Sequence, residues 1–514
     1  MRRRLWLASY ALLAFVSMSL TTRAASSAGS PDTTVETRQP GSATAGTSVV
    51  WLVLDEAPLY ALLRTDGTIN AERFPGFARL ASMSTWYRDT LATVQRTTEA
   101  VPAMLESITP TIRNYPVYAD HPVNLFTLAK GHAELDVFQS ITSLCPRGLC
   151  ANKIPDEERQ AEFQIAQFRA LTRKVAESTE ATVHFSHILL PHRPWRFSTD
   201  MRLARELPTD PRHSTIVDRR RDSYQALLRQ FVATDTLLNE LLDSLESSLN
   251  NDRTMLIVTT DHGMTFVPGE SFRDKVNPAR RDTLEDIYRI PLFIRYPGQT
   301  KGNVSDCTVT SLDILPTVLS VAGIPHTTKF DGVDLSTQCP RRATRRVRWP
   351  YTGTNISSDF SALIDRVRFY DSWVDADGGV DDIDRVGLSG ALIGTEVPPS
   401  APLRRDVTWT NVDPDAFSNI ENERFGYVPA RVSGRVRTTT SICARCEGVL
   451  VVDGIVVASI PEIAGYKPAG KPAYFTTYVD TRTVTSRSGE GELWIADWTT
   501  DTVSWQRVGV SLNE

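Results

Sequence analysis

Three short polar segments that lie far apart in the chain carry residues able to bind a metal ion and to react with an ester. They are Asp55-Glu56, Thr97 and Asp261-His262. Carboxylates with one imidazole can bind Zn²⁺, Mn²⁺, Mg²⁺ or Ca²⁺, and the sequence alone does not choose among these ions. A bound metal would activate the Thr97 hydroxyl, because an alcohol is a weak nucleophile at its own pKa. The segments therefore predict one divalent-metal site that acts on an anionic ester.

Each segment also has a simpler structural interpretation. Aspartate after a strand is common in turns and helix caps, and Thr97 or Thr98 could serve only to cap the helix predicted after them. The N-terminus of that helix carries partial positive charge, which would also suit a phosphate or sulfate oxygen. The metal site is therefore expected only if the fold brings the three segments together.

Further candidate residues carry positive charge or a titratable ring. His192 follows an apolar run and could bind the ester oxygens or protonate the leaving group. Arg193 and Arg281 are candidate substrate-binding residues, because a guanidinium group can hold an anion through two hydrogen bonds. His184 and His187 are weaker candidates, since they lie inside the apolar run, where a histidine can simply pack.

The elements around these segments predict an α/β fold. Residues 49–54 and 255–259 are almost entirely apolar, which is typical of buried parallel strands. Between residues 48 and 340 strand-like and helix-like segments alternate, as in a layered α/β domain. An open parallel sheet collects the residues that follow its strands along one edge, which would bring the acidic pairs together.

Apolar periodicity predicts the individual elements. Helices are expected over residues 74–83, 157–175, 221–249 and 312–322, and further buried strands over 183–190 and 291–295. Gly323 is expected to end the last of these helices in the left-handed conformation. Residues 345–514 are expected to form a smaller β-rich region, with Asp453-Gly454 as a hairpin turn.

The first 47 residues are expected to direct and tether the protein rather than to fold with it. Residues 1–24 combine a basic start, an apolar run and small residues, which predicts a signal peptide or an uncleaved N-terminal anchor. Residues 25–47 are rich in small and polar residues and are expected to be a disordered tether. Either alternative predicts a folded part outside the cytoplasm, secreted or held at the membrane by one segment.

The six cysteines agree with an oxidising compartment. Their proximity in the chain predicts three local disulfides, Cys145/Cys150, Cys307/Cys339 and Cys443/Cys446. The last pair could instead be a redox pair or half of a zinc site, but the chain has no second pair with this spacing.

Length and charge limit the classes of function. A chain of 514 residues with 41% hydrophobic and 23% charged residues is typical of a globular protein with one large and one smaller domain. The net charge of −5 gives no basic surface for nucleic acid, so no nucleic-acid partner is expected.

Across residues 48–340 the chain resembles the sulfatase-like branch of the alkaline phosphatase superfamily. The resemblance rests on segments that occur in the family's order: residues 51–56, 74–80, 97–105, 190–194, 260–263, 290–294, 312–317 and 331–335. It implies a catalytic domain over residues 48–340, with an alkaline-phosphatase-like, doubly wound mixed sheet, and a smaller C-terminal β-rich subdomain.

The resemblance also implies roles for the candidate residues. The two acidic segments stand where the family supplies its metal ligands: Asp55, Glu56, Asp261 and His262. His192 matches the histidine of a His-x-Pro element that contacts substrate. Counting back from Leu105 places Thr97 at the nucleophile position, where it would also be a metal ligand, with Thr98 as the alternative.

One departure from the family pattern bears on the reaction. True sulfatases carry Cys or Ser at the position of Thr97, followed four residues later by an arginine, whereas this chain has Val101 there. Threonine cannot become formylglycine and resembles instead the nucleophile of lipoteichoic-acid synthases and phosphoethanolamine transferases. The resemblance thus implies an exported hydrolase or transferase that acts on phosphoric in preference to sulfuric esters through a covalent threonine, with envelope lipids or glycans as candidate substrates.

An alternative is an inactive protein of the same fold with a binding or envelope-structural role. The β-rich C-terminal region favours it, as does Leu105-Glu106-Ser107 in place of the family's Leu-Thr-Gly. Retention of all the proposed ligands argues against it.

Overall fold

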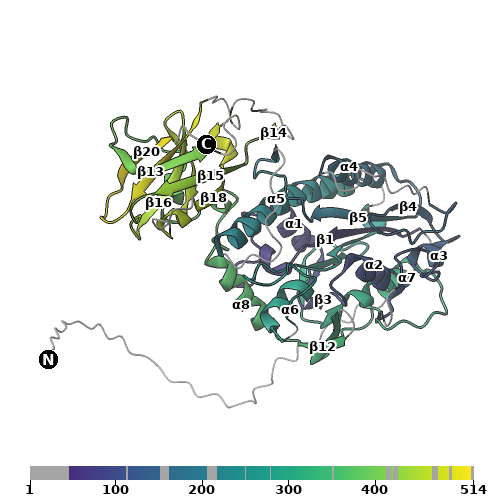
Figure 1. Ribbon diagram of the computed structural model, residues 1–514. Helices are drawn as coiled ribbons and strands as arrows, with labels where there is room; N and C mark the ends of the chain where they lie inside the picture. The colour runs from purple at the N-terminus through teal and green to yellow at the C-terminus, as the bar shows by residue number, and fades with distance from the viewer. Residues whose placement is uncertain are drawn as a thin grey trace, which may run out of the picture. The chain divides into compact units, whose positions relative to one another are not determined.

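A computed structural model provides the structure of the protein (Figure 1). It describes residues 46–110, 114–150, 161–204, 217–248, 251–277, 279–349, 352–411, 417, 420, 427–465, 473–484 and 489–510. The predicted signal or anchor, residues 1–24, and the predicted tether up to residue 45 lie outside the described residues. None of the helices in the described part of the chain combines the length and apolar character that crossing a bilayer requires.

The first sheet has seven strands and mixed direction. Their order is β4 (Glu134–Phe138), β5 (Thr182–Pro191), β1 (Ser48–Asp55), β7 (Thr254–Thr260), β8 (Leu292–Arg295), β2 (Thr85–Tyr87) and β9 (Asn303–Ser305). Strands β4, β5, β1 and β7 are parallel, whereas β8 runs antiparallel to both of its neighbours. The predicted α/β class and mixed sheet are therefore confirmed.

Helices cover both faces of this sheet, as Figure 1 shows. Alternate residues of β1 face two different cores, because successive side chains of a strand point to opposite sides. Leu52 packs with α1 (Pro75–Met83), α4 (Ala161–Glu177) and α5 (Val217–Ser247). Val53 packs with α2 (Thr97–Glu106), α3 (Leu125–Ala129) and α7 (Ile314–Ala322). The predicted helices are confirmed over the described residues, and Gly323 ends α7 with a φ of 66°.

Part of the region predicted to be β-rich packs on this first sheet and contains a helix. Strands β11 (Thr344–Trp349) and β12 (Thr352–Ser357) form a hairpin, followed by α8 (Phe360–Asp371). Arg366 of α8 forms an ion pair with Asp286 at 2.7 Å, from helix α6 (Arg281–Tyr288). Tyr370 stacks on Tyr60 with ring centroids 4.3 Å apart. These contacts join α8 to the core of the first sheet.

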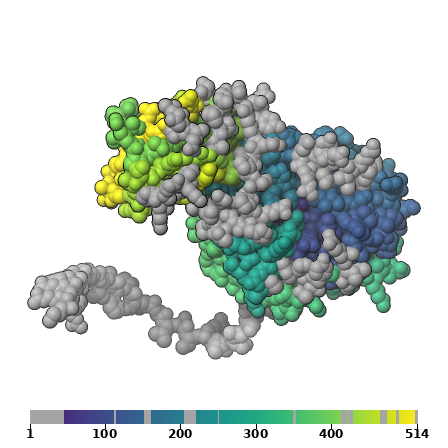
Figure 2. All heavy atoms as spheres, in the orientation of Figure 1, coloured from purple at the N-terminus to yellow at the C-terminus, as the bar shows by residue number. Residues whose placement is uncertain are grey.

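The second large sheet is built from the C-terminal residues and is mainly antiparallel. Its order is β17 (Ile455–Ile460), β16 (Cys446–Val452), β19 (Gly491–Asp497), β20 (Ser504–Val510), β13 (Leu403–Asn411), β15 (Arg431–Thr438) and β18 (Ala473–Tyr478). The hairpin turn predicted at Asp453-Gly454 is present, with φ values of 48° and 78°. Thr477 donates to the Ser459 carbonyl at 2.6 Å, so the two edge strands approach each other. Figure 2 shows that side chains fill the spaces between the ribbons of each part.

Short strands complete the described structure: β3 (Thr90–Leu91) pairs with β10 (Val309–Thr310), and β6 (Leu203–Ala204) with β14 (Tyr427–Val428). The three predicted disulfides, Cys145/Cys150, Cys307/Cys339 and Cys443/Cys446, are all formed.

Candidate metal and nucleophile site

Three neighbouring parallel strands each contribute one ligand-type side chain to the same face of the first sheet. Asp55 ends β1, His187 lies in the middle of β5 opposite Val53, and Asp261 follows β7 directly. Val53 and Phe185, which stand two residues before Asp55 and His187, belong to the core beside α2, and so does Ile257 of β7. All three are fully buried, and one ligand atom from each lies within 4.8 Å of the others. The fold therefore gathers a carboxylate, an imidazole and a second carboxylate.

Glu56 directly follows Asp55, and His262 directly follows Asp261. They complete the two predicted ligand pairs, Asp55-Glu56 and Asp261-His262. Glu56 is fully buried and has a φ of 57°, a left-handed conformation that costs a non-glycine residue about 1 kcal/mol or more. Its backbone N–H donates to Asp261 Oδ1 at 3.4 Å. His262 Nε2 lies 3.2 Å from Asp261 Oδ2, and its Nδ1 lies 3.0 Å from the Gly263 carbonyl oxygen. The strained backbone thus turns Glu56 toward the second pair.

Gly263 keeps the turn after His262 close to the segment that follows Glu56. A Cβ at this position would lie 2.4 Å from the Asp286 carbonyl oxygen and 3.1 Å from Pro58 Cα. The Gly263 N–H also donates to the Ile287 carbonyl at 2.7 Å.

The hydroxyl of Thr97 reaches this group from the first residue of α2. Its Oγ1 lies 3.5 Å from Asp55 Oδ1 and 3.3 Å from His262 Nε2, and the side chain is buried. The helix begins after Arg96, and no side chain caps it, so Thr97 does not act as its cap. Thr98 lines a separate small cavity beside α2, with Glu99 and Glu106. The geometry therefore distinguishes between the two threonines.

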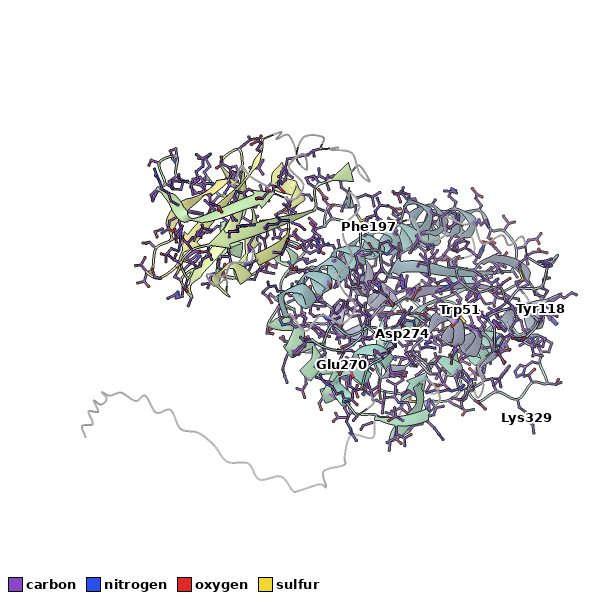
Figure 3. The ribbon with its side chains drawn as sticks, in the orientation of Figure 1. Trp51, Tyr118, Phe197, Glu270, Asp274 and Lys329 are labelled. Carbon is purple, nitrogen blue, oxygen red and sulfur yellow. A yellow bond between two sulfur atoms is a disulfide. The ribbon has the colours of Figure 1, made fainter. Side chains whose placement is uncertain are left out.

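Arg273 also lies at this group of residues, although no local sequence pattern distinguishes it from an exposed loop arginine. Its Nη1 lies 3.0 Å from Glu56 Oε1 and 2.6 Å from His262 Nε2. It comes from the loop between β7 and α6, on which Glu270 and Asp274 are labelled in Figure 3. Asp274 forms an ion pair at 3.4 Å with Arg96, which directly precedes Thr97. That pair fixes the loop to the start of α2.

The other predicted cationic residues lie in different places. His192 Nε2 lies 3.6 Å from Glu56 Oε2, and its Nδ1 contacts the Arg193 carbonyl oxygen. The Arg193 guanidinium lies 5.0 Å from the centre of the ring of Phe272, the residue that directly precedes Arg273. Arg281 is exposed at the start of α6, and no described contact joins it to the site.

Burial and charge fix the protonation states. Burial raises the pKa of Glu56, but nearby positive charges, that of Arg273 foremost and that of Arg193 as well, outweigh it and lower the pKa to about 2. Burial lowers the pKa of His192 to about 4, against the attraction of Glu56. Burial also lowers the pKa of His262, with Asp261 opposing the shift. At neutral pH the site therefore holds an ionised Glu56 and two neutral imidazoles.

These groups fit a divalent metal ion. Both Glu56 oxygens and Asp261 Oδ2 are buried and accept no hydrogen bond, although charged groups lie nearby. A buried carboxylate oxygen without a donor costs free energy that a cation would offset. Metal binding also needs ionised carboxylates and neutral imidazoles, and Glu56, His192 and His262 are in these states. The donors that surround this position are Asp55, Glu56, Thr97, Asp261 and His262.

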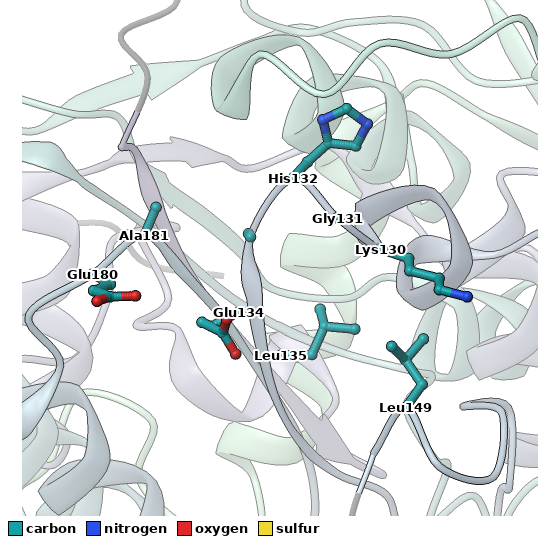
Figure 4. A pocket seen from close by; sticks show the side chains of 9 residues that line it. Lys130, Gly131, His132, Glu134, Leu135, Leu149, Glu180 and Ala181 are labelled. Atoms are coloured by element: carbon teal, nitrogen blue, oxygen red, sulfur yellow. The ribbon is translucent and has the colours of Figure 1, made fainter.

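A larger cavity lies elsewhere and does not include these residues. It has a volume of about 470 Å³ and opens at the start of β4. The candidate metal ligands lie instead at the ends of β1 and β7. Figure 4 shows its lining, which includes Lys130, His132, Glu134 and Glu180. This cavity is therefore separate from the candidate metal and nucleophile residues.

The sequence model of the sulfatase family matches residues 49–324, which include every residue of the metal and nucleophile group. The chain belongs to the sulfatase family. This assignment covers the first sheet and its helices, and it leaves the C-terminal sheet outside the family match.

Individual relatives within and around the family are distant. The ulvan-active sulfatase of Formosa agariphila is 28% identical over 30% of this chain and 30% of its own length. The low-salt glycan biosynthesis sulfotransferase Agl7 of Haloferax volcanii is 28% identical over 34% of this chain and 41% of its own. The chain thus spans less than half the length of these curated relatives. The solved lipoteichoic acid synthase LtaP of Listeria monocytogenes is 16% identical, with a TM-score of 0.42 over 65% of this chain and 93% of that one.

Proposed function

We propose that this sulfatase-family protein is a metal-dependent hydrolase or transferase that cleaves phosphoric esters, in preference to sulfuric esters, through a covalent intermediate on Thr97. The observation that carries the proposal is the position of the Thr97 hydroxyl, 3.5 Å from Asp55 and 3.3 Å from His262. A threonine cannot be oxidised to the aldehyde that family members with Cys or Ser use. It can, however, form a phosphate ester directly.

The residues divide the work of the first step. Asp55, Glu56, Asp261 and His262 would hold a divalent cation, which when bound lowers the pKa of the hydroxyl and offsets negative charge on the transferring group. Thr97 Oγ forms a bond to phosphorus while the bond from phosphorus to the leaving oxygen breaks. The proton lost from Thr97 balances the one gained by the leaving alcohol.

Two arginines bind the ester, and His192 assists the second step. Arg273 and Arg193 bring positive charge to the same side of the site and can bind the unreacting oxygens of the ester. His192 is neutral at pH 7, since burial lowers its pKa to about 4, so its Nε2 can accept a proton from an incoming water or alcohol. Attack by that acceptor on phosphorus releases Thr97. Water makes the protein a hydrolase and an alcohol makes it a transferase.

The substrate is proposed to be an anionic ester of the cell envelope, a lipid or a glycan. Two relatives are named for sulfated or glycan substrates, the ulvan-active sulfatase and the glycan biosynthesis sulfotransferase. Export through residues 1–24 is part of this proposal. The three disulfides support it, because such bonds persist in oxidising compartments.

Intact-mass spectrometry after incubation with bis(p-nitrophenyl) phosphate, phosphatidylglycerol, phosphatidylethanolamine or p-nitrophenyl sulfate tests the proposal. We expect a phosphorus-containing adduct on Thr97 and a higher kcat/KM for the phosphate diester than for the sulfate. Thr97→Ala should lose the adduct and lower kcat by roughly 10⁴-fold or more.

Thr98→Ala is the matched control, because Thr98 faces the separate cavity beside α2 and should keep both the adduct and the turnover. Undiminished cleavage by Thr97→Ala would remove the covalent step. A protein with neither adduct nor turnover on any of these esters would favour the binding or envelope-structural alternative.

A further inference from the structure

We propose that His187 is a direct ligand of the ion held by Asp55 and Asp261, so that the site presents two imidazoles and selects a transition-metal ion such as Mn²⁺ or Zn²⁺ over Ca²⁺. This inference rests on the metal site of the proposed function. It adds a ligand from β5, a strand that contributes none of the residues assigned to the metal above.

The position of His187 in β5 points to a role other than packing. Val183 and Phe185 stand four and two residues before it on the same face and are fully buried in the core beside α2. His187 continues that face and is fully buried as well, so an apolar residue would fill the position at lower cost. Strand β5 is the direct neighbour of β1, which ends in Asp55. The apolar stripe therefore changes to an imidazole opposite Val53, two residues before Asp55.

The hydrogen bond of His187 sets its tautomer. Its Nδ1 lies 2.8 Å from the Ser140 carbonyl oxygen, which can only accept, so Nδ1 carries the proton. Nε2 then has the lone pair that a metal needs. His262 is held in the same way, with Nδ1 3.0 Å from the Gly263 carbonyl oxygen. Holding the far nitrogen with a carbonyl is how proteins orient metal-binding histidines.

The carboxylates around the His187 ring favour a cation. A ligand atom of His187 lies within 4.8 Å of carboxylate oxygens of both Asp55 and Asp261, and the three side chains are fully buried. A lone pair facing two carboxylates is repulsive at low dielectric unless positive charge lies between them. One ion shared by the three groups removes this repulsion.

The resulting donor set decides among metals. Ca²⁺ and Mg²⁺ prefer oxygen donors, whereas imidazole nitrogen suits Zn²⁺, Mn²⁺ and other transition metals. Two imidazoles among the carboxylates therefore move the preference away from Ca²⁺. His184 provides the contrast on the same strand, because its Nδ1 forms an ordinary pair with Asp136 at 3.0 Å.

Metal titration of the full-length, metal-free protein tests the inference without substrate. Calorimetry with Zn²⁺, Mn²⁺ and Ca²⁺ should show wild type binding Ca²⁺ much more weakly than either transition metal. His187→Gln should weaken Zn²⁺ binding by about 100-fold or more, beyond the roughly 10- to 100-fold cost of losing an outer partner. His184→Gln, on the same strand but paired with Asp136, should bind metal like wild type.

Proton NMR of the Co²⁺-substituted protein identifies the ligands directly. Each imidazole bound through Nε2 gives its own exchangeable, strongly shifted Nδ1–H resonance, so His187 and His262 should each contribute one. His187→Gln should lose one resonance and keep the other. The wild-type spectrum is informative even if the variant folds poorly: a resonance for His262 alone would overturn the inference, as would unchanged Zn²⁺ affinity in His187→Gln.

The same data separate this inference from the proposed reaction. Thr97→Ala should keep both imidazole resonances although it loses the covalent adduct. If the protein is inactive but shows both resonances, His187 is a ligand and the proposed reaction is wrong. If the adduct forms but the His187 resonance is missing, the proposed reaction stands and His187 is not a ligand.

Discussion

The two seven-stranded sheets of this protein use acidic residues in opposite ways. In the first sheet, β4, β5, β1 and β7 run parallel, and Asp55 and Asp261 meet at a common edge. In the C-terminal sheet most neighbours run antiparallel, and its acidic residues serve local structure. Asp497 ends β19, and its Oδ1 accepts the Thr499 N–H at 2.9 Å.

The difference follows from strand direction. Parallel strands all end at one edge, so the residues after them converge, whereas antiparallel neighbours end at opposite edges. Asp497 does lie close to Cys443 and Cys446, a spacing that could suit a metal. Those sulfurs are joined in a disulfide, so they are not available as thiolates. The comparison predicts that chemistry depends on the first sheet and that the second contributes stability.

The sharpest test of this comparison exchanges one strand-end aspartate in each sheet. Asp261→Asn should remove most of the bound metal and lower turnover by roughly 10³-fold or more, because a carboxylate ligand is lost from a buried site. Asp497→Asn should leave both unchanged, since it only supports a turn. Elemental analysis and initial rates measure the two effects. Equal losses in both variants would break the comparison.

A smaller effect is expected from the arginine next to Glu56. Arg273→Met should raise KM for a phosphate diester by about 10- to 100-fold, the equivalent of one charge-assisted hydrogen bond of roughly 1.5–3 kcal/mol. Arg281→Met is the matched control, because Arg281 is exposed at the start of α6. Steady-state kinetics decide between the two arginines. A larger increase in KM for Arg281→Met than for Arg273→Met would show that Arg281, and not Arg273, binds the substrate.

The smallest effect concerns a buried acid of the second sheet. Glu447 of β16 accepts the backbone N–H groups of Leu388 at 2.9 Å and Ser389 at 2.6 Å. Glu447→Ala should lower the free energy of unfolding by about 1–3 kcal/mol, because the buried Ser389 N–H and the partly buried Leu388 N–H lose their acceptor. Metal content and kcat/KM should stay at wild-type values. Denaturant unfolding measures the first quantity, and a loss of metal would show that this sheet also supports the site.

Much of the fold and part of the site follow from local sequence. Asp55 and Asp261 could be selected because each follows an apolar run that only a buried strand explains. The alternation of β5 also contained the signal for His187, since counting from Val183 and Phe185 places it on the α2 side. That signal has meaning only once β5 is known to lie beside β1.

Other features depend on tertiary structure that no local pattern contains. Arg273 reaches Glu56 because its loop is fixed through the Asp274–Arg96 pair, and a loop arginine in sequence resembles any exposed one. Helix α8 was not predicted within the β-rich region, because its position depends on pairing between Arg366 and Asp286 of another helix. Which residue begins α2, and that no side chain caps it, likewise depends on the folded backbone and not on a local pattern.

Gly263 sets a limit on how this centre can change. Even one methyl group there would collide with the backbone at Asp286 and press on Pro58, two residues from Glu56. The collision would push the turn after His262 away from the segment that follows Glu56. The missing side chain at this one position therefore sets how closely the two turns can approach each other.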